Sequence, residues 1–223
     1  MTRHALLTRL VSLITAIDNG SPVRVAIDGV DGAGKTTLAD ELVDPIEHCG
    51  RPVIRASVDG FHNPRALRYR KGVDSPEGFY HDSYNYPLLV ETLLNPVGPG
   101  GSRRCRTALF DHRVDAPVGS PLLHVVENAI LLLDGIFLHR PELRGFWDFS
   151  IFLRVDFDVT LERLLQRDAM PEGGIDEDAR RECVRRWQRR YMAGQNLYLR
   201  EADPERWASI VVVNDRPEDP VIA

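Results

Sequence analysis

The sequence predicts an α/β protein built around an open, mainly parallel β-sheet. Short apolar runs, each about the length of one buried strand, alternate along the chain with segments that have the periodicity of amphipathic helices. A glycine-rich motif joins the first of these strands to the helix that follows it. With 223 residues, the chain has room for one large domain of this kind, with or without a small inserted region.

Each predicted element rests on its local pattern. Apolar runs indicate the strands, glycines and prolines indicate where helices end, and the opening segment carries its apolar residues on one helical face. Strands are predicted at 23–28, 52–57, 129–134, 149–154 and 210–213, and helices at 6–17, 37–47, 87–94, 160–166 and 178–192. A β-hairpin is predicted over 103–118, after a turn at 96–101.

The segment from His62 to Tyr86 is predicted to be a long loop. It is rich in Pro, Gly, Tyr and Arg and has too little apolar periodicity for a core element. Loops of this length are usually functional or disordered, and the aromatic density favours a functional loop. Its aromatic residues either stack on a planar ligand or anchor the loop to the body of the protein: Phe79, Tyr80, Tyr84 and Tyr86.

Composition and charge exclude several classes of protein. The formal net charge of −5 argues against a general binder of nucleic acid or of membrane surfaces, and no apolar run reaches the length of a membrane span. The apolar stretch 6–17 is interrupted by Arg9 and lacks a cleavage site, so it is predicted not to be a signal peptide. Three cysteines without metal-binding spacing predict reduced thiols and a cytoplasmic location.

The glycine-rich motif is Gly29-Val30-Asp31-Gly32-Ala33-Gly34-Lys35-Thr36, which fits the phosphate-loop pattern G-x-x-x-x-G-K-[ST] at every required position. Its amides and the positive end of the next helix predict a cradle for the phosphates of ATP. Lys35 is expected to reach the β- and γ-phosphates, and Thr36 to ligate Mg²⁺. The predicted nucleotide-binding residues are Gly29, Asp31, Gly32, Ala33, Gly34, Lys35, Thr36 and Thr37.

The lysine of this motif strengthens the prediction, because the chain has only two lysines, Lys35 and Lys71, among 28 basic residues. Arginine serves nearly everywhere else, whereas a phosphate loop requires a compact ammonium group on a slender stem. The alternative interpretation is a glycine turn within an ordinary βα unit.

Two carboxylates follow predicted strands and are expected near the phosphate loop, because ligands of open parallel sheets bind beyond the carboxyl ends of the strands. Asp59 follows strand 52–57 and could accept the proton of an attacking hydroxyl, help to hold the metal, or simply form a turn or helix cap. Asp134 ends the apolar strand 129–134 and is expected to hold Mg²⁺ through water.

Two arginine-bearing helices on either side of Pro171-Glu172-Gly173-Gly174 predict a lid. Closure would bring Arg163 and Arg167 onto the transferring phosphate, whereas the arginines of 178–192 are interpreted as a solvated helix face. In the predicted hairpin, His112 either contacts the substrate or is structural.

This ordered set of motifs resembles the uridine kinase and phosphoribulokinase family of P-loop small-molecule kinases over about residues 23–215. The resemblance implies a P-loop NTPase fold, which is a doubly wound parallel sheet with helices on both faces, in a single domain 1–223. It further implies an acceptor-binding region inserted at 62–118 and an arginine-bearing lid at about 163–193. In the family, the acid that matches Asp59 is the catalytic base, and the arginines that match Arg163 and Arg167 stabilise the transferring phosphate.

The chain departs from the pattern of uridine kinases in the acceptor region. Those enzymes carry Asp-His-Pro-Asp-Ala-Phe where this chain has Tyr80-His81-Asp82-Ser83-Tyr84, which loses one acid that would hold ribose hydroxyls. The Arg-Gly-Arg of their lid is replaced by Glu172-Gly173-Gly174, and their usual Glu is Asp134.

The predicted activity is phosphoryl transfer from MgATP to a hydroxyl of a small molecule, with a nucleoside such as uridine as the leading acceptor. Pantothenate, a sugar or a hydroxy acid is the alternative acceptor. A nucleotide-dependent switch is the alternative of another class, although the chain lacks the Asn-Lys-x-Asp motif for guanine. The predicted catalytic residues are Asp59, Lys35, Arg163 and Arg167. The expected acceptor contacts are Asp59, Phe61, His62, Tyr80, Asp82 and His112. A homodimer is compatible with the prediction.

Overall fold

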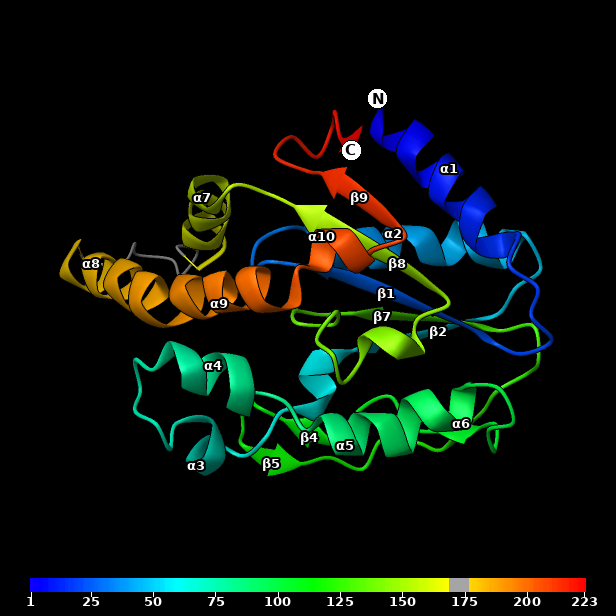
Figure 1. The fold of residues 1–223 in the computed structure, drawn as a ribbon, viewed down its shortest axis with the longest axis horizontal. Coiled ribbons are helices and arrows are strands. Elements are labelled where there is room, and N and C mark those ends of the chain that lie inside the picture. The colour runs from blue at the N-terminus through cyan, green and yellow to red at the C-terminus, as the bar shows by residue number, and fades with distance from the viewer. Residues whose placement is uncertain (169–176) are drawn as a thin grey trace.

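A computed structural model describes residues 1–168 and 177–223, and within these ranges the chain forms a six-stranded sheet with the strand order β10-β9-β8-β1-β7-β2 (Figure 1). Neighbouring strands are parallel except for β10, which pairs antiparallel with β9. The five predicted strands are all present. The strands of this sheet are β1 (Val23–Gly29), β2 (Val53–Ser57), β7 (Ile130–Asp134), β8 (Phe149–Arg154), β9 (Ile210–Val213) and β10 (Val221–Ile222).

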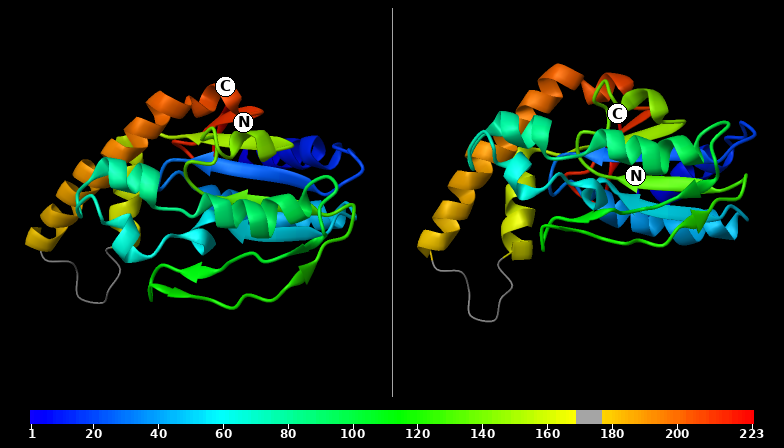
Figure 2. Two further views of the ribbon diagram at one scale, coloured as in Figure 1. Left: turned by 60° about the horizontal axis from the view of Figure 1, so that its bottom comes forward. Right: turned by 90° about the horizontal axis from the view of Figure 1, so that it is seen from below.

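Helices cover both faces of this sheet, which confirms the doubly wound α/β fold (Figures 1 and 2). On β7, Ile130 and Leu132 belong to the core on the side of α1 (Arg3–Thr15) and α2 (Lys35–His48), while Leu131 and Leu133 belong to the opposite core. Because β7 is buried on both sides, its sequence is a continuous apolar run rather than an alternating one.

The region between β2 and β7 is more regular than the sequence predicted. The prediction of a long loop over 62–86 is wrong, because this segment forms two short helices, α3 and α4. A helix of seven residues makes fewer than two turns, so α4 has no periodicity to detect. The elements of this region are η1 (Val58–Phe61), α3 (Arg65–Arg68), α4 (Pro76–Asp82), α5 (Tyr86–Leu89), η2 (Val90–Leu94), α6 (Asn95–Val97), β3 (Arg104–Cys105), β4 (Phe110–Asp111), β5 (Ala116–Pro117) and β6 (Leu123–His124).

The aromatic residues of this region anchor it to the sheet. Phe79, Tyr80, Tyr84 and Tyr86 are each at most 7% exposed and belong to one core cluster. The predicted hairpin is present in a short form, as β4 pairs with β5, while β3 pairs with β6 beyond the predicted range.

The helical segment that follows β8 is longer than predicted. The helix expected at 178–192 corresponds to α8 and η4, and the chain continues without a break into α9, ten residues past the expected end. Gly194 lies inside this helical run and does not end it. A Cβ at this position would come within 2.8 Å of Phe79 on α4, so the glycine allows the two helices to pack closely. The predicted break at 171–174 lies outside the described residues. The elements here are η3 (Arg144–Phe146), α7 (Phe157–Asp168), α8 (Glu177–Arg186), η4 (Trp187–Met192), α9 (Ala193–Ala202) and α10 (Pro204–Trp207).

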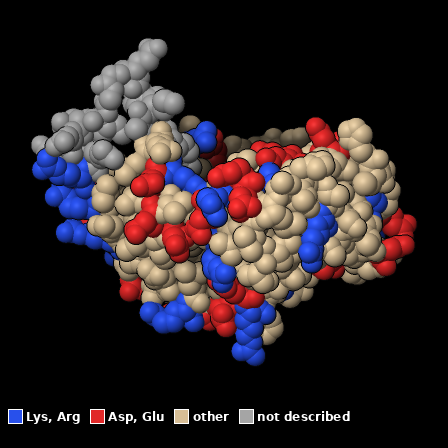
Figure 3. Space-filling model, turned by 90° about the horizontal axis from the view of Figure 1, so that it is seen from above, with Lys and Arg blue, Asp and Glu red and all other residues tan. Residues whose placement is uncertain are grey.

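The surface is of mixed charge. On the face shown in Figure 3, acidic and basic side chains are interspersed over most of the area. Exposed ion pairs such as Arg3 with Glu41 and Arg154 with Glu205 join neighbouring elements. None of the helices in the described part of the chain combines the length and the apolar character needed to cross a bilayer.

A buried carboxylate joins the sheet to α9 at the carboxyl end of β1. Asp28 is fully buried and accepts hydrogen bonds from the Gly29 amide, from the amide and Nδ1 of His139, and from the Tyr198 hydroxyl. A buried charge is tolerated only when it is hydrogen-bonded in this way. The carboxylate therefore fixes where the segment after β1 begins.

We predict that Tyr198→Phe lowers the free energy of unfolding by about 1–3 kcal/mol, because it removes one donor from a buried carboxylate. Tyr86→Phe is the matched control: Tyr86 is also buried, yet its hydroxyl has no hydrogen-bond partner among the described residues. Its removal should be neutral or stabilising. Urea unfolding of both variants measures the difference, and equal effects would refute the role given to Asp28.

Candidate active site

The segment between β1 and α2 has the geometry of a phosphate loop. Gly32 and Gly34 adopt positive φ values of 75° and 91°, which residues with a side chain rarely adopt. A Cβ on Gly32 would also lie 3.0 Å from the Thr160 carbonyl oxygen. Gly34 stands directly before α2, so the positive end of that helix faces the loop.

Three side chains hold the carbonyl groups of this loop. The Lys35 ammonium donates to the Val30 carbonyl at 2.8 Å, Asn214 Nδ2 donates to Ala33 at 2.8 Å, and Arg163 Nη1 donates to Gly32 at 3.1 Å. Asn214 and Arg163 come from the far end of the chain and from α7. The loop is therefore braced from outside the motif itself.

The side of the loop expected to bind metal contains two oxygen ligands in contact. Thr36 Oγ1 donates to Asp134 Oδ2 at 2.7 Å, and Arg55 Nη1 donates to Asp134 Oδ1 at 2.6 Å. Arg55 also pairs with Asp40 at 2.9 Å. A hydroxyl and a carboxylate oxygen are ligands that suit Mg²⁺, so these residues fit the ion. Asp134 is only 4% exposed in its side chain and is held from both sides.

On the acceptor side, Asp59 lies in the short helix η1 directly after β2. Its side chain is 57% exposed, and its Oδ1 accepts a hydrogen bond from the Tyr84 hydroxyl at 3.1 Å. Burial raises the pKa of Tyr84 well above 10, with the Asp59 charge adding to the effect, so the phenol remains a donor at neutral pH. Tyr84 thus orients Asp59 without neutralising it.

Two stacked histidines lie beside Asp59. The rings of His62 and His112 have centroids 4.4 Å apart at an angle of 30°, and His62 Nδ1 donates to the Asp59 backbone carbonyl at 2.9 Å. Burial lowers the pKa of His62 below its ordinary value of 6.5, although Asp59 opposes this shift. At neutral pH the His62 ring is uncharged and leaves the charge of Asp59 uncompensated.

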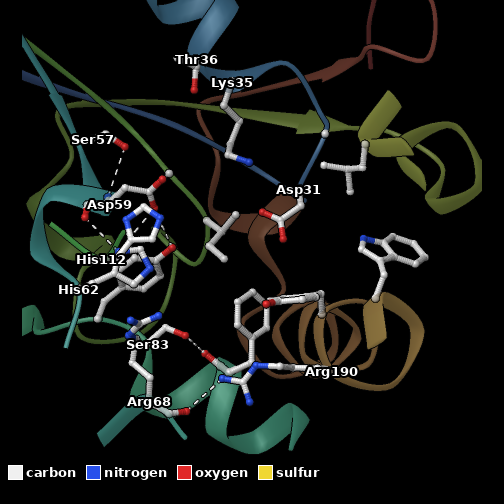
Figure 4. A pocket seen from close by; sticks show the side chains of 18 of the residues that line it. Asp31, Lys35, Thr36, Ser57, Asp59, His62, Arg68, Ser83, His112 and Arg190 are labelled. Carbon is white, nitrogen blue, oxygen red and sulfur yellow. Dashed lines mark hydrogen bonds and ion pairs between the residues drawn. The ribbon is translucent and has the colours of Figure 1, made fainter. Parts of the chain in front are cut away.

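One pocket of about 570 Å³ joins these parts (Figure 4). The phosphate loop contributes Asp31 and Lys35 to its lining, η1 contributes Asp59, and η4 contributes Arg190. Arg190 donates to the carbonyls of Arg68, Gly72, Val73 and Ser75, so η4 is attached to the chain segment that leads into α4.

Some predicted acceptor contacts lie around the pocket and others do not. Asp59, His62 and His112 line it. Phe61 and Tyr80 are buried in the core, and Asp82 is 5% exposed and pairs with Arg70 at 2.7 Å. These three residues are outside the pocket lining, because their side chains pack under the region rather than over the opening.

The predicted nucleotide-binding set is also divided. Asp31, Gly32, Gly34, Lys35 and Thr36 line the pocket, whereas Gly29, Ala33 and Thr37 are outside its lining. Gly29 and Ala33 shape the turn from behind, where Ala33 is fully buried. Thr37 is exposed on α2.

Of the two arginines predicted to belong to the lid, the structure describes the side-chain contacts of Arg163 alone. Arg163 donates to the carbonyls of Gly32, Asn214 and Asp215 and is outside the pocket lining, so in this structure it braces the phosphate loop. Arg167 is in the last turn of α7, and its side chain is outside the described part of the structure.

Sequence reasoning missed Gln195, Asn214 and the bond from Tyr84 to Asp59. Gln195 lies on α9 and is 1% exposed. Its Oε1 accepts a hydrogen bond from the Asp31 backbone amide at 2.6 Å. Partners this distant in sequence leave no local signal. Only the resemblance of the chain to a known fold could have suggested that α9 and the segment after β9 reach the loop.

The fold and this pocket define a kinase of the P-loop class that acts on small molecules. Residues 25–195 match the Phosphoribulokinase / Uridine kinase family, and the chain belongs to this family. The resemblance found in the motifs is thereby confirmed, and the chain is an ATP-dependent small-molecule kinase.

Individual relatives agree with this assignment. The chain is 27% identical over 175 residues to the uridine kinase of Saccharomyces cerevisiae, a match that covers 76% of this chain and 32% of that protein. It is 28% identical over 158 residues to the uridine kinase of Lactobacillus helveticus, covering 68% and 70%. A structure described as a possible uridine kinase from Bacillus stearothermophilus superimposes with a TM-score of 0.71 at 22% identity, covering 93% and 97%.

We predict that Arg163→Met weakens the affinity for ADP about tenfold, because its contact with the Gly32 carbonyl of the phosphate loop is lost, together with its contacts with the Asn214 and Asp215 carbonyls after β9. Titration with a fluorescent ADP analogue measures the change. Arg185→Met is the matched control, because Arg185 is exposed on α8 and pairs with Glu182. A variant with unchanged ADP affinity and a large loss of kcat would instead favour a role for Arg163 on the transferring phosphate.

Proposed function

We propose that this kinase transfers the γ-phosphate of ATP to a hydroxyl of a small molecule bound between Asp59 and the region 62–118, and that a nucleoside such as uridine is the leading acceptor. The observation that carries the proposal is that the Asp59 carboxylate and the Lys35 ammonium line one pocket. A base and a phosphate-binding cation on the same opening are what in-line phosphoryl transfer requires.

Each residue has a distinct proposed role. Lys35 and the loop amides bind the β- and γ-phosphates, and Asp59 accepts the proton of the attacking hydroxyl. Tyr84 and the Asp59 backbone contact of His62 orient that base. Thr36 and Asp134 would hold Mg²⁺, which when bound neutralises phosphate charge. Arg167 is the lid arginine proposed to meet the transferring phosphate, and Arg163 supports it by bracing the loop.

Support for a nucleoside comes from the relatives, whose names are those of uridine kinases, and from the rings around Asp59. His62 and His112 stack at 30°, and the Tyr84 ring lies against His62 at 50°, with the His62 and Tyr84 centroids 4.5 Å apart. The stacked histidine pair lines the pocket and offers a ring surface to a planar base.

A second class of acceptor is favoured by one observation. Arg68 lines the pocket, and its side chain is 10% exposed and pairs with Asp115 at 3.2 Å. A buried guanidinium group beside the acceptor position suits a carboxylate, such as that of a hydroxy acid.

A screen of ADP release separates these candidates. The purified protein with MgATP is offered nucleosides, pantothenate, sugars and hydroxy acids, and the acceptor is the compound that raises ADP release far above the rate with ATP alone. A slow hydrolysis of ATP that no alcohol accelerates would refute the kinase assignment and favour a nucleotide-dependent switch.

The cytoplasmic location is also a proposal, supported by three free cysteines.

We predict that Asp59→Asn lowers kcat on the true acceptor by about 10²- to 10⁴-fold, the range for a general base, while ATP affinity remains close to that of the wild type. Steady-state kinetics and nucleotide titration give the two quantities. Asp44→Asn, an exposed position on α2, is the control and should retain full turnover. Turnover that survives Asp59→Asn would show that another group accepts the proton.

A further inference from the structure

Arg55 is an arginine inside a strand of the main sheet, and it is bound to the carboxylate of the proposed metal site. On β2 it pairs in register with Leu132 of β7, two residues before Asp134, and Leu132 belongs to the core on the side of α1 and α2. Because side chains alternate along a strand, Arg55 lies on the face of the sheet that α2 covers. Its side chain is 25% exposed and is outside the lining of the pocket, whereas Asp134 lines the pocket.

Two carboxylates share this guanidinium group. Arg55 Nη1 donates to Asp134 Oδ1 at 2.6 Å, and Arg55 Nε donates to Asp40 Oδ1 on α2 at 2.9 Å. The partners differ in environment, because the Asp134 side chain is 4% exposed and that of Asp40 is 61% exposed. Water screens the charge of an exposed carboxylate, whereas a buried one depends on its partner. Arg55 is therefore the cation that compensates the charge of Asp134.

The second oxygen of Asp134 is bound to the other proposed metal ligand. Thr36 Oγ1 donates its hydrogen to Asp134 Oδ2 at 2.7 Å, and a hydroxyl that donates in this way still has lone pairs to offer to a cation. Mg²⁺ demands octahedral coordination, and in kinase sites it takes most of its ligands from water and from the phosphates of the substrate. With the charge of Asp134 compensated by Arg55, this site attracts a divalent cation only weakly before a nucleotide is bound.

We propose that Arg55 makes metal binding depend on the nucleotide: its guanidinium group compensates Asp134 in the free enzyme, so that a divalent cation binds at Thr36 and Asp134 only together with the phosphates of ATP or ADP. Arg55 is thus a positioning residue that acts through Asp134. The inference rests on the proposed metal-binding role of Thr36 and Asp134. Its consequence is that the metal enters the site as a complex with the nucleotide.

Binding of Mn²⁺ to the full chain without nucleotide tests the inference, with Mn²⁺ as a paramagnetic substitute for Mg²⁺ that electron paramagnetic resonance detects. Arg55→Met should bind Mn²⁺ about tenfold or more tightly than the wild type, because a positive charge near the cation has been removed. Arg55→Gln, which keeps a donor for Asp134, should change in the same direction. Arg154→Met is the matched control: Arg154 also lies on a strand of the sheet, but it pairs with Glu205, and its loss should leave Mn²⁺ affinity unchanged.

Thermal unfolding gives a second measurement that a purely structural role would not produce. Arg55→Met should be less stable than the wild type, and saturating Mg²⁺ without nucleotide should raise its Tm by about 3–8 °C, because the cation binds only the folded state. At matched ionic strength, the rise in the wild type should be about 1 °C or less. The double variant with Arg55→Met and Asp134→Asn should lose the rise. Arg55→Gln carries both measurements if the methionine variant does not fold.

Equal Mn²⁺ affinity in the wild type and both Arg55 variants would overturn the inference, as would a nucleotide-free wild type that binds Mn²⁺ as tightly as it does with ADP. A loss of stability that Mg²⁺ does not restore in either Arg55 variant would also overturn it, because Arg55 would then only join β2 to α2. In all these cases, binding of Mn²⁺ to the wild type with ADP and turnover in the ADP-release screen would leave the proposed function standing. A wild type that binds no Mn²⁺ even with ADP would refute both this inference and the proposed metal-binding role of Thr36 and Asp134.

Discussion

The buried carboxylate of Asp28 is the contact on which the geometry of the site depends. It lies where β1 ends, and it binds the first amide of the phosphate loop, the backbone and ring of His139 after β7, and the Tyr198 hydroxyl on α9. A charge removed from water must be fully hydrogen-bonded, so these three segments can take only one arrangement around it. The phosphate loop starts from a fixed point, and α9 is fixed to the same point.

Strand order then brings the catalytic groups together. Because β7 lies between β1 and β2, Asp134 pairs in register with Ile27 on one side and with Ser57 on the other. The phosphate loop follows β1 and Asp59 follows β2, so the three features meet at one edge of the sheet. Parallel strands end on the same side, and this alone makes residues more than a hundred positions apart neighbours.

The sequence predicted the features that are written locally. Continuous apolar runs identified all five parallel strands, and the spacing of Gly29 to Thr36 identified the loop. Helix α4 was missed because it is shorter than two turns, and α9 because Gly194 looks like a helix end although it serves close packing against Phe79. Tyr80 and Asp82 were expected at the acceptor because residues 80–84 stand where uridine kinases carry their acceptor motif. A sequence pattern does not tell which way a side chain points, and both side chains are buried.

The continuous helical run from α8 through η4 to α9 touches both halves of the pocket. Arg190 binds carbonyls of the segment between α3 and α4, and one helical turn further on Gln195 binds Asp31 of the phosphate loop. One rigid body thus bears on the donor and on the acceptor. Occupancy of either half that shifts this body changes the affinity of the other half, and thermodynamic reciprocity requires the change to be the same factor in both directions. Coupling between the two halves of the pocket would therefore be carried by this helical run.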